Sequence, residues 1–405
     1  MIEGKRKNNR YFYQLWLLVA CTLLFYSFFF QYGIKPINGV MIILCTILIL
    51  FGCIQIIFVQ HGKIKKDRYL YFYIFWVLGF IITIFMANAK YGLDLEIRML
   101  EYLLSSYSIY LLLKSKPEYL NIITFDISIT VTLLAVNSLI KGVVVSSSGA
   151  IGLQSLNTNV MSSFFLLMAY CIFILCRNKH NLIFELLLCI MMGIVVIAQI
   201  SAASRRGFLV LGMFLFAAIS VYFIPLRTQY RSRMRFLMYI TLTVLVIIML
   251  LIMKDYLLQK TALGARLLGA NNTGDLARAR YQAFALEQFK NHPILGIGLG
   301  GIAYNVGAYS HSMYYELISC TGLLGTTIFF FGFLGIGYDL MMVSRNKTII
   351  KEDRSLSWLS FIFWGCILIS GIAVVMIYDF YFYIYISLLC AVLSKNRGKP
   401  QYIKN

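Results

Sequence analysis

Long apolar stretches alternate with short polar segments along almost the whole chain. Most of these stretches approach the roughly 20 residues that a helix needs to cross the hydrocarbon core of a membrane. About twelve stretches fit this description, and they begin near Tyr11, Ile37, Tyr69, Met99, Leu120, Val160, Leu182, Gly207, Phe236, Tyr315, Leu356 and Phe380. The fourth and the twelfth are the shortest. The pattern predicts an all-α fold, a polytopic membrane helical bundle.

One polar segment, residues 254–314, is much longer than the other connections and lies between the ninth and tenth spans. Asp275 is placed as a helix N-cap, and Asn291-His292-Pro293 is a helix-ending sequence. Between them, an apolar stripe at helical spacing is formed by Leu276, Ala279, Ala283 and Leu286. The segment is therefore expected to contain an amphipathic helix that lies on the membrane surface or packs on the bundle. Residues 1–405 then form a single membrane domain with one elaborated loop.

The composition leads to the same class of protein. Of the 405 residues, 60% are hydrophobic and only 13% are charged, against about 25% charged in a typical soluble domain. Such a chain is neither a cytosolic enzyme, nor disordered, nor a disulfide-stapled secreted domain. The nine cysteines lie in apolar stretches without paired disulfide or C-x-x-C spacing, which indicates small buried side chains. The first apolar run lacks a small-residue cleavage site, so we interpret it as a span.

The net charge of +20 would suggest nucleic acid as a partner in a soluble protein, but here it is explained by topology. If the N-terminus is inside the cell, about two thirds of the 36 Lys and Arg residues fall in inner segments such as HGKIKKDR, RTQYRSRMR and SRNKTIIKEDR. The positive-inside rule then places both termini in the cytoplasm and residues 254–314 outside. We expect a multi-pass protein of the cytoplasmic membrane, with membrane lipids and no nucleic acid as partners.

Two adjacent arginines, Arg205 and Arg206, lie on the outer side in a short turn before the span that begins at Gly207. One interpretation is that both long side chains simply reach to the membrane interface. The other is an anion site, because a guanidinium in the first turn adds to the helix dipole and the free backbone N–H groups. Arg278 and Arg280, in the predicted loop helix, point about 200° apart around its axis. At most one of them is expected to join Arg206.

Of the four histidines, His311 is the candidate for chemistry. It lies at the outer mouth of the tenth span, just before Tyr314 and Glu316. A histidine with a pKa near neutrality can accept a proton from a sugar hydroxyl, whereas a lone histidine is more often structural. The other three occupy basic inner loops or a helix end: His61, His180 and His292.

Two further patterns carry less information. Residues 296–301 spell G-x-G-x-x-G, but they follow a predicted helix and not a strand, which favours close packing over dinucleotide binding. Acidic residues within the spans are sparse, the clearest being Glu101, Asp126 and Glu185. They are a weak signal for a proton path in a transporter, and each is equally suited to a hydrogen bond with a neighbouring helix.

Three ordered segments resemble motifs of the O-antigen ligase/polymerase superfamily of bacterial membranes, which contains the Wzy polymerases and the lipid A-core ligases. SAASRRGFLVL is similar to its Ser-Arg-Gly element, RARYQAFALEQFKNHPILGIGLGG to its Arg, helix and Pro-x-x-Gly-x-Gly element, and SHSMYYELISCTGLLG to its His-Asn-x-x-Leu-Glu element. The resemblance covers roughly residues 200–325. Ser312 stands where Asn is usual, and Cys320 where a second acid is common.

The resemblance implies a GT-C-like fold and roles for particular residues. His311, Arg206 and Arg278 match the catalytic His–Arg–Arg set, with Arg280 in reserve for Arg278. Glu316 matches the Glu of the third motif, and it joins Arg205, Arg280 and Tyr314 as expected substrate-binding residues.

The implied reaction is polymerisation of oligosaccharide repeat units carried on undecaprenyl diphosphate, at the outer face of the membrane, to build capsule, exopolysaccharide or O-antigen. Arginines would stabilise the leaving diphosphate and His311 would deprotonate the acceptor hydroxyl. No metal and no cofactor are expected. The growing polysaccharide, a chain-length regulator and a flippase are the candidate partners. A glycan ligase of the same superfamily and, in another class, a lipid-linked oligosaccharide flippase are the alternatives.

Overall fold

The computed structural model describes residues 2–30, 39–59, 68–84, 92–145, 151–153, 158–177, 182–202, 204–223 and 273–397. Its first half contains α1 (Ile2–Phe25), η1 (Tyr26–Phe30), α3 (Val40–Ile54), η2 (Gln55–Val59), α4 (Arg68–Ile84), α5 (Gly92–Ser115), α6 (Tyr119–Lys141), β1 (Val143–Val145) and β2 (Ile151–Leu153). Its second half contains α7 (Thr158–Cys176), α8 (Leu182–Ser201), α9 (Arg205–Phe223), α13 (Thr273–Asn291), α14 (Gly301–Val306), α15 (Met313–Arg345), α16 (Lys351–Gly371), η4 (Met376–Tyr378) and α17 (Phe380–Arg397).

The helices form the predicted membrane bundle. Each predicted span coincides with a helix except the ninth, near Phe236, which lies outside the described residues. Seven of the described helices are long and apolar enough to cross a membrane, and two shorter apolar helices accompany them. Among the described residues, the one departure from an all-α chain is a short antiparallel hairpin of β1 and β2, between α6 and α7 in the sequence. The protein is a multi-pass membrane protein, and its total number of spans stays a prediction.

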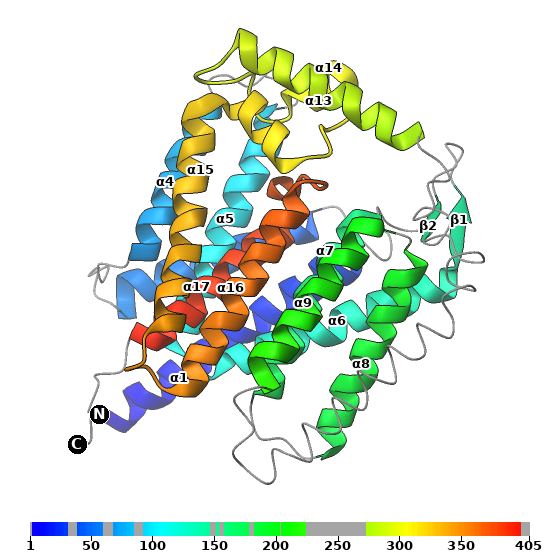
Figure 1. Cartoon of the computed structure of the whole chain (residues 1–405). Helices are drawn as coiled ribbons and strands as arrows, with labels where there is room; N and C mark the ends of the chain where they lie inside the picture. Colours follow the sequence, from blue (N-terminus) through cyan, green and yellow to red (C-terminus); the bar gives the residue numbers. More distant parts are fainter. Residues whose placement is uncertain are drawn as a thin grey trace, which may run out of the picture.

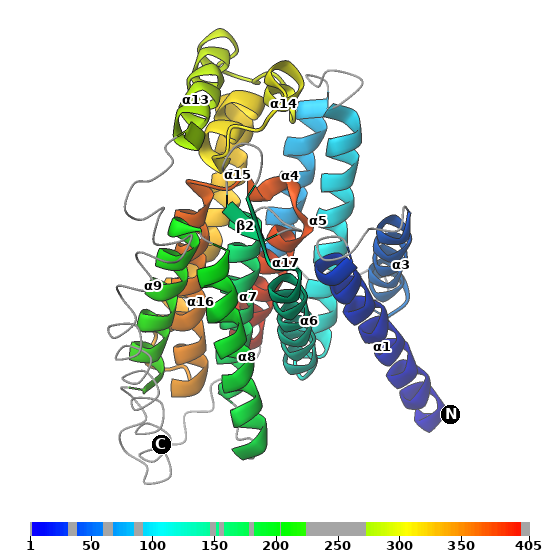
Figure 2. The ribbon, with the colours of Figure 1, turned by 90° about the vertical axis from the view of Figure 1, so that its right-hand side faces the viewer.

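The most buried helices lie in the middle of the bundle. In α7, 78% of the span is buried, whereas in the apolar helix of residues 40–57 the share is 28%. A helix that is apolar all round is suited to burial among other helices, and α17 is likewise buried along most of its length. Figures 1 and 2 show α7 and α17 among the other helices, and Figure 2 shows α1 and α3 on one flank. These two central helices therefore form the core that the outer spans cover.

Several polar groups inside this core form hydrogen bonds between helices. The Tyr170 ring of α7 stacks on Phe363 of α16 at 4.1 Å, and its hydroxyl is 2.7 Å from the Ser360 hydroxyl. The Tyr385 hydroxyl of α17 donates to the carbonyl oxygen of Ser163 in α7 at 2.7 Å. Because no water is present in a membrane core to satisfy these groups, each such bond fixes the alignment of two helices. The central helices are thereby aligned with α16.

The predicted loop helix exists as α13 and lies with α14 across one end of the bundle (Figure 1). It begins at Thr273, so Asp275 lies within its first turn and is not the N-cap. The predicted apolar stripe does not pack on the bundle, because Leu276 is 66% exposed and Leu286 is 41% exposed; its predicted placement at the membrane surface stays a prediction. The helix packs on α15 through another face, on which Ala285 is fully buried.

The helix α15 is broken at Gly322, whose φ of 60° and ψ of −165° are not helical. The Tyr314 ring stacks on Phe330 with a centroid distance of 5.8 Å. In a continuous helix, a separation of 16 residues would place these two side chains about 24 Å apart. The short segment before Gly322 therefore folds back along the longer segment after it. The candidate tenth span, Met313–Arg345, therefore has its long straight part after the break, in residues 323–345.

The loop after α13 closes this break. Backbone N–H groups of Leu323 and Leu324 donate to the carbonyls of residues 293 and 294, at 2.8 and 3.1 Å. In return, Ile297 and Gly298 donate to the carbonyls of residues 319 and 320, at 3.0 and 2.9 Å. These four bonds replace the helical bonds that the break removes. The loop and the short segment of α15 thus form one unit at this end of the bundle.

Candidate functional site

The arginine pair opens α9. Ser204 is the N-cap, because its hydroxyl accepts the backbone N–H of Gly207 at 3.2 Å and donates to the Asn159 Oδ1 atom at 2.9 Å. A side chain at Gly207 would overlap Ser162 of α7, so the glycine permits close approach of the two helices. Arg206 is exposed, and one of its Nη atoms reaches the carbonyl oxygen of Ile372 at 3.5 Å. Arg205 is half-buried.

A small polar pocket lies against Arg206. It is formed where α7, α9 and the end of α16 meet, and its volume is about 20 Å³, which is enough for a water molecule. Besides Arg206, its polar lining consists of Asn159, Ser162, Ser163, Ser204 and Ser370. Hydroxyls and a guanidinium are donors suited to phosphate or sugar oxygens. The helix N-terminus adds its positive end to the same place.

His311 lies in a tight turn just before α15. Its φ of 58° is the only positive φ among the described residues other than glycine, and such a conformation is uncommon for a residue with a side chain. The turn is closed by Ser310, whose hydroxyl donates to the carbonyl of Ser312 at 2.8 Å and accepts its N–H at 3.3 Å. The surrounding structure therefore fixes the backbone conformation from which the imidazole projects.

A buried carboxylate anchors this turn. Glu316 is fully buried, and its Oε2 accepts the backbone N–H of Ser310 at 2.9 Å. Its Oε1 accepts the hydroxyl of Tyr378 at 2.9 Å, and that hydroxyl accepts the N–H of Gly300 at 3.1 Å. The Cys320 thiol is 3.8 Å from the same oxygen. Glu316 thus joins the His311 turn, the glycine-rich loop and η4 through one network, and within this network it contacts protein donors.

Arg278 is the loop arginine whose charge acts on His311. It is half-buried on α13, whereas Arg280 is exposed. Tyr281, on the same helix, lies with its ring centroid 6.0 Å from that of His311. Burial first, and then the positive charge of Arg278, lower the pKa of His311 from its ordinary value of 6.5. The imidazole is therefore neutral at neutral pH, the form in which it can accept a proton.

Tyr314 connects the His311 turn to the neighbourhood of Arg206. Its hydroxyl donates to the carbonyl of Leu368 in α16 at 2.6 Å, one turn before Ile372. At Gly371 an added Cβ would lie 2.9 Å from the side chain of Met313, which shows how closely the start of α15 lies against the end of α16. The hydroxyl of Tyr314 is thereby engaged with the bundle.

The structure thus brings the predicted residues to the same end of the bundle in two groups. His311 and Arg278 form one group, and Arg205 with Arg206 form the other, with the end of α16 between them. Glu316 and Tyr314 support this arrangement from within the protein, and Arg280 lies on the exposed side of α13. Other cations of the long loop, Lys254, Lys260 and Arg266, lie outside the described residues.

The glycine-rich run has the packing role predicted for it. Gly296 has a φ of 72°, and a Cβ there would overlap the Cys320 carbonyl group. A Cβ at Gly322 would equally overlap the carbonyl group of Ile294. Only glycine permits this close approach of loop and broken helix. The run therefore holds the loop in the break of α15.

Two residues of the site were not predicted. Ser204 had a signal, since a serine directly before a helix start is a common N-cap. Tyr378 had none, because it lies 62 residues after Glu316 in a short 3₁₀ turn and meets it only in the fold. Among the described residues, no three His, Cys, Asp or Glu side chains come together in a group that could hold a metal ion.

Comparisons with known proteins leave the family open. No protein-family model matches the chain, and no curated protein matches it significantly.

Proposed function

We propose that the protein is a membrane glycosyltransferase that polymerises oligosaccharide repeat units carried on undecaprenyl diphosphate. The observation that supports this most is the pairing of a neutral, rigidly held His311 with Arg278, at the end of the bundle where Arg206 is exposed. The order of the three motifs adds the resemblance to Wzy polymerases. The positive-inside prediction places this end outside the cell, where such donors are used.

In the proposed reaction, His311 takes the proton of an acceptor sugar hydroxyl. The acceptor oxygen attacks the anomeric carbon of the donor, and the bond between that carbon and the diphosphate oxygen breaks. The electron pair leaves with undecaprenyl diphosphate. Arg206 and Arg278 stabilise the negative charge that develops there, since guanidinium groups bind phosphate oxygens through paired N–H donors. The protein's own cations supply this stabilisation, so a chelator is expected to have little effect.

The test uses purified protein and lipid-linked repeat units, with product length followed on a gel. His311→Asn is the informative variant, because Asn adopts a positive φ more readily than most residues and preserves the turn. Loss of a general base lowers the rate by about 10²–10⁴-fold. The matched control is His292→Asn, an exposed histidine just after α13, which is expected to retain the wild-type rate.

The products separate the candidate functions. A ladder of lengthening glycans made by the wild type, and lost in His311→Asn, supports a polymerase. Transfer of one intact glycan to a different acceptor would instead identify a ligase of the same superfamily. Unchanged substrate with folded wild-type protein would contradict both enzyme functions. It would favour the alternative of a flippase that transports the same lipid.

A further inference from the structure

Tyr378 lies in the short turn η4, two residues before α17 begins at Phe380, and outside the three motifs of the resemblance. Its hydroxyl donates to Glu316 Oε1 at 2.9 Å and accepts the backbone N–H of Gly300 at 3.1 Å. One phenol group therefore joins a buried carboxylate and the start of α14 to the segment that leads into the central helix α17.

Tyr378 supports the two residues that precede His311 by two separate routes. Its ring centroid lies 5.1 Å from that of Tyr309, with the ring planes tilted by 40°. The other route passes through the carboxylate of Glu316, whose Oε2 accepts the backbone N–H of Ser310 at 2.9 Å. The chain just before His311 is thus held once by the ring of Tyr378 and once through its hydroxyl.

The His311 turn requires such support because its backbone conformation is uncommon. A φ of 58° in a residue with a side chain persists only where the surrounding structure holds it. On the side after the turn, the Tyr314 hydroxyl is bonded to α16. On the side before the turn, the ring contact and the bonds of the carboxylate both lead to Tyr378. The conformation from which the imidazole projects therefore depends on Tyr378.

We propose that Tyr378 is a positioning residue for His311 and that it acts through Glu316. This role rests on the proposed function, in which His311 takes the proton of the acceptor hydroxyl. The effect of Tyr378 is indirect, because its hydroxyl orients one oxygen of the carboxylate while the other oxygen holds the turn. A displacement of about 1 Å at a reacting group can lower a rate by about 10²-fold. Loss of this one hydroxyl therefore affects the rate without removing any reacting group.

The first test is Tyr378→Phe, which removes the hydroxyl and keeps the ring that contacts Tyr309. The buried carboxylate then loses its phenol donor, and the N–H of Gly300 loses its acceptor. We expect kcat on lipid-linked repeat units to fall about 10–10²-fold. KM is expected to stay the same, because the variant leaves Arg206 and Arg278 unaltered.

The titration of His311 gives a second readout that needs no substrate. The protein has four histidines, so their NMR signals in histidine-labelled protein can be followed one by one, and His311→Asn identifies the signal of His311. Burial first, and then the charge of Arg278, lower the pKa of His311. A turn loosened by Tyr378→Phe admits water, so the pKa of His311 is expected to rise toward its ordinary value. Arg278 and Tyr281, on α13, are unchanged in this variant.

The matched control is Tyr383→Phe. Tyr383 is buried, and its hydroxyl donates to the carbonyl of Ile377 in the same turn at 2.8 Å. Each phenylalanine variant loses one buried hydroxyl, so both are expected to lower Tm by a similar amount. Only Tyr378→Phe is expected to change kcat and the titration of His311.

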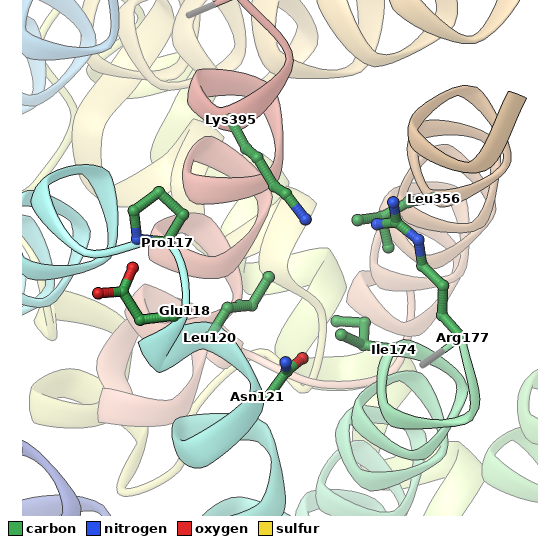
Figure 3. Close-up of a pocket in the computed structure, with 8 residues that line it drawn as sticks. All are labelled: Pro117, Glu118, Leu120, Asn121, Ile174, Arg177, Leu356 and Lys395. Atoms are coloured by element: carbon green, nitrogen blue, oxygen red, sulfur yellow. The ribbon is translucent and has the colours of Figure 1, made fainter. Parts of the chain in front are cut away.

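A distant control is Asn121→Ala. Asn121 lines a polar pocket near the starts of α6 and α16, at the opposite end of the bundle from His311 (Figure 3). This variant shows whether His311 responds to any polar substitution in the protein. Both kcat and the titration of His311 are expected to stay at their wild-type values.

A double-mutant cycle with Glu316→Gln tests the route of the effect. If Tyr378 acts through Glu316, Tyr378→Phe lowers kcat less in the Glu316→Gln background than in the wild type, so the two effects are not additive. If the wild type has no activity on lipid-linked repeat units, the proposed function fails, and the titration of His311 still decides whether Tyr378 positions it.

The positioning role is overturned if His311 titrates in Tyr378→Phe as it does in the wild type, or if Tyr383→Phe changes that titration as much. Additive effects in the cycle would equally overturn it. Should Tyr378→Phe fail to fold, Glu316→Gln disturbs the same hydrogen bond from its other side. The same rise in the pKa of His311 is expected there, and an unchanged titration would count against the proposal.

Discussion

The arginines at the two ends of the α7/α16 pair differ in burial and in the contacts that they make. At one end, Arg177 is almost buried and forms a 2.6 Å bridge with Asp353 of the adjacent helix. At the other end, Arg206 is exposed, and its contact with α16 is a 3.5 Å approach to the Ile372 carbonyl. The carboxylate nearest to the His311 turn, Glu316, is engaged by N–H and O–H donors.

Arg177 therefore holds two helices together, whereas Arg206 is exposed to a ligand from outside. A charge bridged to a carboxylate in a low-dielectric setting aligns two helices, and its loss leaves the partner buried and charged. An exposed guanidinium at a helix N-terminus adds less to stability than a buried bridge, and it can be reached by an anion from outside. Substitution of Arg177 is therefore expected to lower stability, and substitution of Arg206 is expected to lower activity.

The largest expected effect is at Arg177. Arg177→Met leaves Asp353 buried without its bridge, and we expect a loss of about 3–5 kcal/mol in the free energy of unfolding, measured by denaturant titration in micelles. The double variant Arg177→Met/Asp353→Leu removes both charges and is expected to recover most of this loss. If the double variant is no more stable than the single one, the bridge is not what aligns α7 with α16.

The next effect is at Arg206. Arg206→Ala is expected to lower kcat by about 10²–10³-fold, as for loss of one charge-stabilising donor, with Tm almost unchanged because the side chain is exposed. The control is Arg345→Ala, an exposed arginine at the end of α15, for which the wild-type rate is expected. A large drop in Tm for Arg206→Ala with normal activity in the surviving folded protein would make this arginine structural as well.

The sequence alone predicted the helices and the candidate residues of the His311 end, but not the contacts between distant segments. Hydropathy located the helices because each span must satisfy its own backbone in lipid. Motif order selected His311, Arg206 and Arg278, and their role stays a prediction. Sequence patterns did not predict features that depend on contacts between residues far apart in the chain. The fold-back of α15 depends on loop residues 293–298 bonding into the break at Gly322, and no local pattern marks that pairing. For α13, helical spacing identified an apolar stripe but not which of the two predicted surroundings would cover it, and the structure shows that the bundle does not.

The smallest effect concerns the pH dependence of the His311 end. The charge of Arg278 contributes, after burial, to a pKa of His311 below 6.5, so the rate should fall as the pH drops through that lowered pKa and the imidazole becomes protonated. Arg278→Gln removes the positive charge and lets the pKa rise, and the acidic limb of the kcat profile should move to higher pH. Lys290→Gln, in the last turn of α13, is the control and should leave the limb in place. If the limb stays in place or moves to lower pH in Arg278→Gln, this arginine does not act on His311. The comparison with the Arg177–Asp353 end would then rest on Arg206 alone.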